Sequence, residues 1–356
     1  MKVVHVVGAR PNFMKMAPAY RALARRPGIA QSLVHTGQHY DANMSDIFFQ
    51  QLGMPTPDMN LGVGSGSHAA QTAQIMIKFE ELVLRDRPDL VLVYGDVNST
   101  VAATLVCAKL GIKVGHVEAG LRSFDREMPE EINRLVTDQL ADILFTPSVD
   151  GDENLKREGV AAGKIHLVGN LMIDTLVRLL DRAQKPAING IDGNYALVTL
   201  HRPSNVDELV MLRQIVETLN ELSARIPVIF PIHPRTRRRI TDFGLQLADG
   251  SRLALLEPIG YLEFLALQRD AQLVITDSGG IQEETTYLGV PCLTVRNNTE
   301  RPITVEIGTN ILVGQDMERL TTQADRVLSG NAKKGSVPPL WDGRAGERVA
   351  EIVVRL

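Results

Sequence analysis

Two series of short, β-branched, apolar runs alternate with longer stretches of helical character along this chain. The first series covers residues 3–7, 32–37, 90–95, 113–118, 143–147 and 165–169, and the second covers residues 195–200, 228–233, 253–258, 272–277, 291–295 and 310–314. The runs are continuously apolar, which is typical of strands buried on both faces of a parallel sheet. The chain is therefore predicted to be α/β, with two Rossmann-like, doubly wound domains.

The length of 356 residues exceeds what one hydrophobic core usually supports. Between the two series, residues 176–194 begin as a helix and then become rich in Pro, Gly and Asn. We expect an N-terminal domain over residues 1–172 and a C-terminal domain over residues 173–338. Residues 339–356 begin at a Pro-Pro break and carry apolar residues at helical spacing, so they should form a terminal helix that packs back on the N-terminal domain.

Charge and composition exclude several classes of function. A formal net charge of −4 provides no broad basic surface for a nucleic-acid partner. The N-terminal apolar run is too short for a signal peptide, and no segment approaches the roughly 20 apolar residues of a membrane span, so a soluble cytoplasmic protein is expected. Cys107 and Cys292 both lie in apolar runs and should be buried small side chains.

Open α/β sheets bind ligands at the carboxyl ends of their strands, so residues that follow the strands are the functional candidates. Arg10 and Lys15 follow the first strand, where a helix begins. The N-terminus of a helix favours anions, which predicts an anion site here; the alternative is a solvated helix start. The segment is neither a Walker loop nor a GxGxxG fingerprint, so no nicotinamide cofactor is predicted.

Acidic residues gather after two neighbouring strands of the first series. Asp96 follows residues 90–95, and Glu118 ends the next run. Soon afterwards Glu130 and Arg134 stand four residues apart at the start of a predicted helix and share one of its faces. An ion pair on the surface is the simpler interpretation of the last two residues. Together, however, three carboxylates and an arginine predict an acid/base cluster, without a metal site.

The second series contains a glycine turn between residues 272–277 and a helix. The backbone N–H groups of Ser278, Gly279 and Gly280 are predicted to bind a diphosphate there. Glu284 lies about one turn inside the helix, where its carboxylate can accept hydrogen bonds from ribose hydroxyls. A carboxylate at this offset makes a nucleotide site a more specific prediction than two glycines alone.

Two histidines, His201 and His233, also follow strands of the second series. One histidine is more often structural, but two on the same side of a sheet favour a role in binding or catalysis. The basic run from Arg235 to Arg239 is interpreted as the solvated start of a helix.

Five segments carry a resemblance to a known family. They are HVEAGLRS (116–123), PEEINR (129–134), TLHRPSNV (199–206), DSGGIQEE (277–284) and TERP (299–302). Together with GARPNFMK at the N-terminus, they closely resemble the non-hydrolysing branch of the UDP-N-acetylglucosamine 2-epimerase family. That resemblance implies two Rossmann-like domains of the glycosyltransferase B type with a cleft between them.

The resemblance also implies roles for individual residues. It implies contacts to UDP from Arg10, Lys15, His201, Ser278, Gly279, Gly280, Glu284 and Arg301, with His233 also on the substrate and Phe264 near the uracil. It implies a catalytic cluster of Asp96, Glu118, Glu130, Arg134 and His201. The implied reaction inverts C2 of a UDP-N-acetylhexosamine through loss and re-addition of UDP, without cofactor or metal, in a protein that is expected to be a homodimer.

The resemblance leaves several alternatives open. Tyr40, Asp41 and the loop SFDREMPEE resemble archaeal members and the subgroup acting on UDP-2,3-diacetamido-2,3-dideoxyglucuronate, so the C3 and C6 substituents of the sugar stay open. A hydrolysing epimerase, a retaining glycosyltransferase of the same fold and a UDP-sugar sensor are further alternatives.

Some bacterial members of the family bind their own substrate at a second, activating site. This chain keeps residues 36–39 and Gln71 of that region, but Tyr40 and Asp41 replace the usual pair, and Ala70 stands where an arginine aligns. An acidic side chain and a missing guanidinium disfavour a second diphosphate. We therefore expect epimerisation to proceed without an activator.

Overall fold

The computed structural model describes residues 1–37, 53, 56–188, 191, 193–246 and 251–356. The chain divides into two compact units. The first unit comprises Met1–Arg178 and Pro339–Leu356, and the second unit comprises Leu179–Pro338.

The first unit contains a parallel sheet with the strand order β3-β2-β1-β4-β5-β6-β7. Its strands are β1 (Lys2–Val7), β2 (Ala30–His35), β3 (Met59–Asn60), β4 (Leu90–Tyr94), β5 (Lys113–Val117), β6 (Ile143–Thr146) and β7 (Ile165–Leu167). β4 is buried along its whole length, as its continuous apolar sequence predicts. The strand order reverses between β1 and β4, which is the position where doubly wound sheets bind their ligands.

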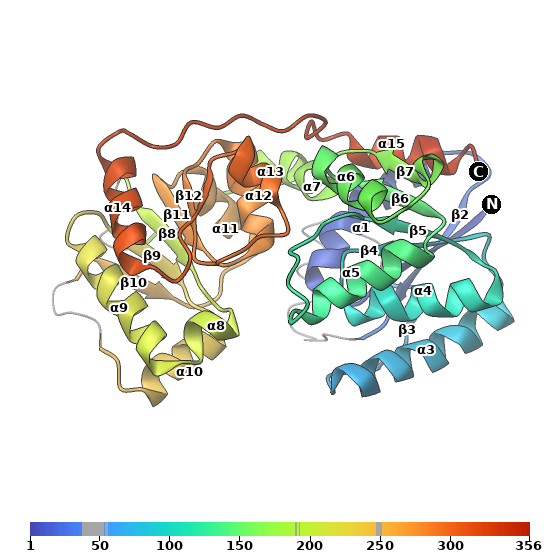
Figure 1. The fold of residues 1–356 in the computed structure, drawn as a ribbon, viewed down its shortest axis with the longest axis horizontal. Helices are drawn as coiled ribbons and strands as arrows, with labels where there is room; N and C mark the ends of the chain where they lie inside the picture. The colour runs from blue at the N-terminus through green and yellow to red at the C-terminus, as the bar shows by residue number, and fades with distance from the viewer. Residues whose placement is uncertain (38–52, 54–55, 189–190, 192, 247–250) are drawn as a thin grey trace. The chain divides into compact units, whose positions relative to one another are not determined.

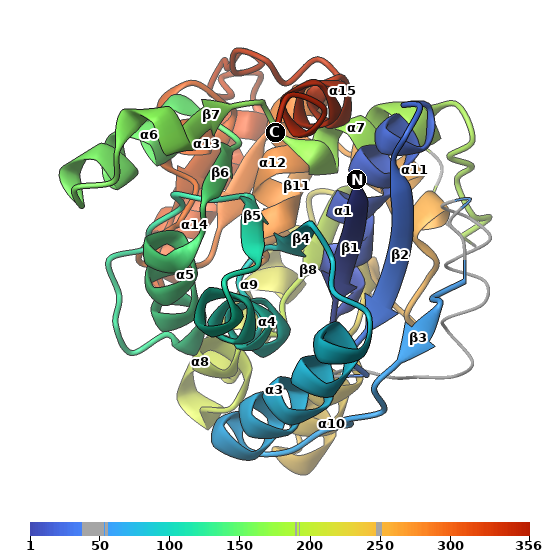
Figure 2. The ribbon, with the colours of Figure 1, turned by 90° about the vertical axis from the view of Figure 1, so that its right-hand side faces the viewer.

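Helices cover both faces of this sheet. They are α1 (Arg10–Ala24), α3 (His68–Arg85), α4 (Asn98–Leu110), α5 (Pro129–Leu140), α6 (Val149–Arg157), α7 (Leu171–Leu180) and α15 (Ala345–Val353), with a short 3₁₀ turn at Ala162–Lys164. α3, α4 and α5 lie side by side on one face, and α1 packs with α15 on the other (Figures 1 and 2).

The last helix of the chain is tied to the first unit by named contacts. The Asp174 carboxylate accepts hydrogen bonds from the N–H groups of Ala345 and Gly346, at 3.0 and 2.7 Å, and so caps α15. The Trp341 indole donates to the carbonyl of Pro147 at 2.9 Å. These contacts explain why the chain after Pro338 belongs to the first unit.

The second unit contains a parallel sheet with the strand order β10-β9-β8-β11-β12-β13. Its strands are β8 (Ala196–Thr199), β9 (Val228–Pro231), β10 (Leu253–Leu256), β11 (Leu273–Thr276), β12 (Cys292–Thr294) and β13 (Asn310–Leu312). Its helices are α8 (Pro203–Val206), α9 (Leu209–Ser223), α10 (Pro234–Asp242), α11 (Tyr261–Arg269), α12 (Gly279–Leu288), α13 (Pro302–Glu306) and α14 (Met317–Leu328). α9 and α14 pack together over one core cluster, and α11 and α12 contact each other (Figure 1).

The prediction of two Rossmann-like, doubly wound parallel sheets is confirmed. Cys107 and Cys292 are both buried thiols. None of the helices in the described ranges is both long enough and apolar enough to cross a membrane.

Candidate active site

The carboxyl ends of β1, β4 and β5 bring two oppositely charged side chains of the first unit together. Lys15, on α1, forms an ion pair with Glu118, which directly follows β5. Both residues are buried, with 6 % and 7 % of their surface exposed. Gly95 has a φ of 67°, and a Cβ there would lie 3.0 Å from Lys15 Nζ and 3.3 Å from Glu118 Oε2. A glycine before Asp96 is therefore needed to leave room for the pair.

Asp96 has a separate cationic partner. Arg134 of α5 pairs with the Asp96 carboxylate through Nη1 and donates to Glu131 Oε2 through Nε and Nη2, at 3.0 and 2.7 Å. Burial alone raises the pKa of Glu131, but hydrogen bonds from Ser123 and Arg134 lower it overall. The two carboxylates proposed for proton transfer, Asp96 and Glu118, thus each contact a buried cation of their own.

The structure arranges the start of α5 differently from the expected i, i+4 pairing. Glu131 is the carboxylate buried beside Arg134, whereas Glu130 is exposed. Arg10, the other expected anion contact on this unit, is also exposed. Sequence reasoning missed Glu131, and the adjacent glutamates of PEEINR were the signal that either could be the partner.

The buried face of α5 is polar along much of its length. Asp138 lies one turn beyond Arg134 and is 1 % exposed. Its Oδ1 is 2.6 Å from His116 Nδ1, and the other ring nitrogen of His116 is 2.8 Å from the carbonyl oxygen of Gly95. The Gly120 N–H donates to Asp138 Oδ2 at 3.1 Å. Asp138 of α5 therefore contacts the backbone next to Glu118 directly, at Gly120. It contacts the backbone next to Asp96 through His116, at Gly95.

In the second unit, a fully buried aspartate, Asp277, organises the residues after β8. Its carboxylate accepts hydrogen bonds from the N–H groups of His201 and Arg202, at 3.0 and 2.8 Å, and from Asn205 Nδ2 at 3.0 Å. The rings of His201 and His233 lie 5.8 Å apart between centroids. Burial and the charges of His201 and a nearby arginine lower the pKa of His233. Asp277 was part of a recognised motif, but the sequence did not reveal its positioning role.

The glycine turn is formed as expected at the start of α12. Gly279 and Gly280 are the first two helical residues, whose N–H groups have no partner within a helix. The Ser278 N–H donates to Thr276 Oγ1 at 3.0 Å, within the turn. A Cβ at Gly279 would collide with the guanidinium of Arg301. A larger residue at this position would displace the Arg301 guanidinium from the turn.

Arg301 is more deeply buried than a simple phosphate contact would need. It is 7 % exposed, its Nε lies 2.8 Å from Glu283 Oε1, and its Nη1 pairs with Glu300. This arrangement holds the Arg301 guanidinium next to the glycine turn, between the carboxylates of Glu283 and Glu300.

A carboxylate and two aromatic side chains form the remaining part of this site. Glu284 is 3 % exposed and accepts a hydrogen bond of 2.8 Å from the Tyr261 hydroxyl. Burial raises the pKa of the Glu284 carboxyl to about 7. Tyr261 and half-buried Phe264 both lie in the first turn of α11. The i, i+3 spacing of the two rings was the signal that could have identified Tyr261.

Residues 38–41 of the expected activating region lie outside the described residues. Gln71 is described: its Nε2 donates to the carbonyl of Gly64 at 2.9 Å, and its Oε1 accepts from Asn98 Nδ2 at 2.8 Å. These bonds give Gln71 a role within the first unit.

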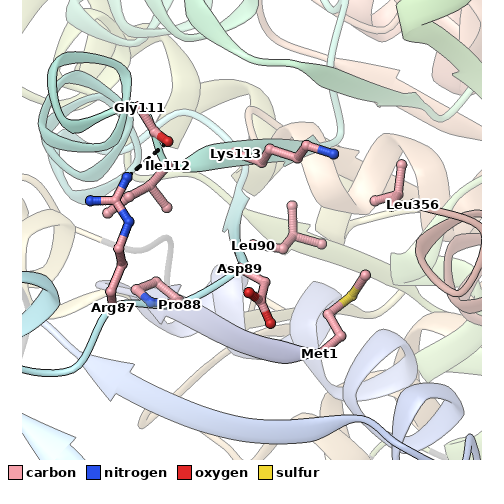
Figure 3. A pocket seen from close by; sticks show the side chains of 9 residues that line it. All are labelled: Met1, Arg87, Pro88, Asp89, Leu90, Gly111, Ile112, Lys113 and Leu356. Atoms are coloured by element: carbon pink, nitrogen blue, oxygen red, sulfur yellow. Dashed lines mark hydrogen bonds between the residues drawn. The ribbon is translucent and has the colours of Figure 1, made fainter.

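A pocket of about 440 Å³ lies at the opposite, amino-terminal edge of the first sheet (Figure 3). It is lined by the starts of β4 and β5 and by both ends of the chain. Arg87, which lines it, donates to the carbonyls of Leu110 and Gly111 at 2.7 and 3.0 Å. Because the carboxylate cluster lies at the carboxyl ends of the strands, we do not assign the chemistry to this pocket.

Comparisons with known proteins agree with this geometry. The family model described as UDP-N-acetylglucosamine 2-epimerase matches residues 21–354. The UDP-N-acetylglucosamine 2-epimerase of Methanocaldococcus jannaschii is 45 % identical, over 99 % of both chains. The UDP-2,3-diacetamido-2,3-dideoxy-D-glucuronate 2-epimerase of Pseudomonas aeruginosa is 42 % identical, over 100 % of both chains.

Solved structures give the same assignment. The crystal structure of the Methanocaldococcus jannaschii enzyme in complex with UDP-GlcNAc and UDP matches with a TM-score of 0.91 and 44 % identity over 100 % of both chains. A lipopolysaccharide outer core galactosyltransferase matches with a TM-score of 0.58 at 13 % identity over 100 % of both chains, a likeness of fold alone. The fold is thus the two-Rossmann glycosyltransferase B type, and the chain belongs to the UDP-N-acetylglucosamine 2-epimerase family.

Proposed function

We propose that this protein interconverts the gluco and manno configurations at C2 of a UDP-N-acetylhexosamine, as a non-hydrolysing isomerase. The proposal is supported by relatives named for this reaction at 43–45 % identity over nearly the whole chain. It is also supported by a carboxylate cluster at the switch point of the first sheet and a nucleotide-binding turn on the second.

The chemistry explains why carboxylates are needed. A C2–H beside an acetamide is not appreciably acidic, so a base cannot remove it directly. If UDP leaves first or in concert, the positive charge that develops at C1 acidifies the C2–H bond. A carboxylate then removes the proton and leaves a 2-acetamidoglucal. Proton return to the opposite face, followed by re-addition of UDP, gives the C2 epimer.

The single observation that carries this proposal is that Asp96 and Glu118 are held by two different cations at the ends of neighbouring strands. They follow adjacent strands, and each contacts a separate buried cation, Arg134 or Lys15. An inversion needs proton transfer on both faces of C2, and two independently held carboxylates can divide that work. Glu130 and His201 remain proposed members of the catalytic set.

The second unit is proposed to bind the UDP group. The N–H groups of Gly279 and Gly280 and the neighbouring Arg301 are suited to the diphosphate, whose departing charge they stabilise electrostatically. Glu284 is suited to the ribose hydroxyls, and Phe264 to the uracil. Ser278 and His233 complete the proposed set, together with Arg10 and Lys15 from the first unit.

Proton NMR of the purified protein with UDP-N-acetylglucosamine alone tests this function. An epimerase forms the manno nucleotide without any acceptor. A glycosyltransferase leaves the substrate unchanged without an acceptor, a hydrolysing epimerase releases free N-acetylmannosamine and UDP, and a sensor gives no turnover.

A second candidate substrate is UDP-2,3-diacetamido-2,3-dideoxyglucuronate, because a relative named for that substrate covers the whole chain at 42 % identity. The same NMR experiment with this nucleotide decides between the two by comparing kcat/KM. We also propose, from the family resemblance, that the protein works as a homodimer in the cytoplasm, which light scattering and cell fractionation can test.

A further inference from the structure

Phe124 combines two features that are unusual in one residue. It lies in the loop between β5 and α5, and its backbone has a left-handed φ of 58°. Its side chain is 75 % exposed, more than that of any other large apolar residue in the described ranges. Left-handed backbone is rare for a bulky residue because the Cβ crowds the following carbonyl. Neither local strain nor an exposed ring stabilises the folded protein.

The strained loop is held by one buried carboxylate. Glu131 accepts hydrogen bonds from the N–H of Phe124 through Oε1 and from the N–H and hydroxyl of Ser123 through Oε2, each at 3.0 Å. The same Oε2 accepts two hydrogen bonds from Arg134, which pairs with Asp96. Phe124 is therefore connected to a proposed catalytic carboxylate through only two side chains.

Residues with a strained backbone lie close in sequence to the proposed catalytic residues. In the part of the chain that the structure describes, the non-glycine residues with positive φ are Glu118, Phe124 and Leu340. Two of these three, Glu118 and Phe124, lie six positions apart in the sequence, and Glu118 is a proposed proton-transfer residue. Strained residues persist where their surroundings fix them, and they gather at ligand sites.

We propose that Phe124 contacts the 2-acetamido group of the bound nucleotide sugar and selects for an apolar acyl group on C2. This inference rests on the proposed function. The acetamido group is attached to the reacting carbon, so it must lie beside Asp96 and Glu118 when a proton is transferred. Its methyl group is an apolar surface suited to an aromatic ring, and contact with it removes both from water. Glu131 fixes the backbone that carries the ring, through its hydrogen bond from the Phe124 N–H.

The test uses a variant that removes the ring without disturbing the backbone. Phe124→Gly adopts a positive φ without strain and keeps the N–H that Glu131 binds. Calorimetry should show affinity for UDP-N-acetylglucosamine weakened at least about tenfold, the low end for one lost apolar contact in a pocket. Affinity for UDP, which lacks the acetamido group, should stay unchanged. Phe124→Tyr keeps the ring and should bind both nucleotides like the wild type.

Leu84→Ala provides a matched control, because Leu84 on α3 is 61 % exposed and lies outside the proposed site. It should change neither affinity. The melting temperature of Phe124→Gly should not fall, because strain is relieved and no buried contact is lost.

Three results would overturn the proposal: unchanged affinity of Phe124→Gly for UDP-N-acetylglucosamine, equal weakening for both nucleotides, or dissociation of an oligomer as the sole effect. The last result would assign the ring to a subunit contact. The comparison of affinities does not depend on turnover, so failure of the proposed function appears separately, as a wild-type protein that forms no C2 epimer.

Discussion

Lys15 and Glu118 form a buried ion pair between α1 and the residue that follows β5, although the sequence suggests different tasks for them. Lys15 is proposed to bind the diphosphate, and Glu118 is proposed to transfer a proton at C2. A diphosphate that binds Lys15 must compete with Glu118 for the same ammonium group. We infer that departure of the negatively charged leaving group and release of the Glu118 carboxylate are linked through Lys15.

The pair should make a measurable contribution to stability. Lys15→Met leaves Glu118 buried without a cation, which we expect to lower the free energy of unfolding by about 3–5 kcal/mol. Urea unfolding of the variant measures this loss. The exposed pair of Arg157 and Glu153 is the control, because Arg157→Met should change stability by no more than about 1 kcal/mol. Equal effects of the two substitutions would contradict the buried pairing.

Glu118→Gln should separate binding from chemistry. The amide keeps the shape of the side chain but cannot take a proton, so turnover should fall by at least about a hundredfold. UDP affinity should be retained or increase, because the diphosphate no longer competes with a carboxylate for Lys15. Initial rates and calorimetry on the same preparation measure both quantities. A variant that loses UDP affinity but keeps kcat would assign Glu118 to binding.

Glu284 should make the stability of the second unit depend on pH. Its pKa is raised from 4.5 in the unfolded chain to about 7 in the folded protein. The stability that the protonated group contributes is fully present below about pH 4.5 and is lost as the pH rises through about 7. The side chain of Glu284→Gln does not titrate, so it makes no pH-dependent contribution of this kind. The free energy of unfolding of the variant minus that of the wild type should therefore increase by on the order of 3 kcal/mol between about pH 5 and pH 8. A difference independent of pH would contradict the buried, protonated carboxyl.

The same variant tests the proposed ribose contact. Hydroxyl donors favour the ionised carboxylate, so wild-type UDP affinity should increase with pH near 7 more steeply than that of Glu284→Gln. At higher pH the variant should bind UDP more weakly by roughly 1.5–3 kcal/mol, the usual value of a charged hydrogen bond. Unchanged affinity in a folded variant, measured by calorimetry, would remove Glu284 from the nucleotide site.

Epimerisation should need no activating nucleotide. Ala70 cannot supply a guanidinium, and the Gln71 amide is bonded to Gly64 and Asn98. Starting from the manno nucleotide alone, product should therefore form without a lag. Strict inactivity that a trace of gluco nucleotide relieves would show that a second site operates despite these substitutions.

Much of the fold could be predicted because the strands of a parallel sheet have a continuous apolar sequence. The run 90–95 corresponds to β4 and the run 113–118 to β5, each within one residue. β3, with two residues, was missed because so short a strand has no periodicity.

The site was predictable where function requires a particular backbone, as at the glycine turn before α12. It was less predictable on α5, because the buried residues Glu131, Arg134 and Asp138 form a polar stripe. Hydropathy cannot distinguish such a stripe from a solvent-facing one. Only the structure shows that Glu131 and Arg134 are buried against each other and that Asp138 is buried against His116.

Turnover of UDP-N-acetylglucosamine in deuterated water tests the central claim most directly. If a carboxylate removes the C2 proton and returns one to the other face, the manno product should carry deuterium at C2, and proton NMR should show the C2–H signal lost as the product forms. Product that retains the original proton at C2, or no C2 epimer at all, would contradict the proposed proton transfer by Asp96 and Glu118.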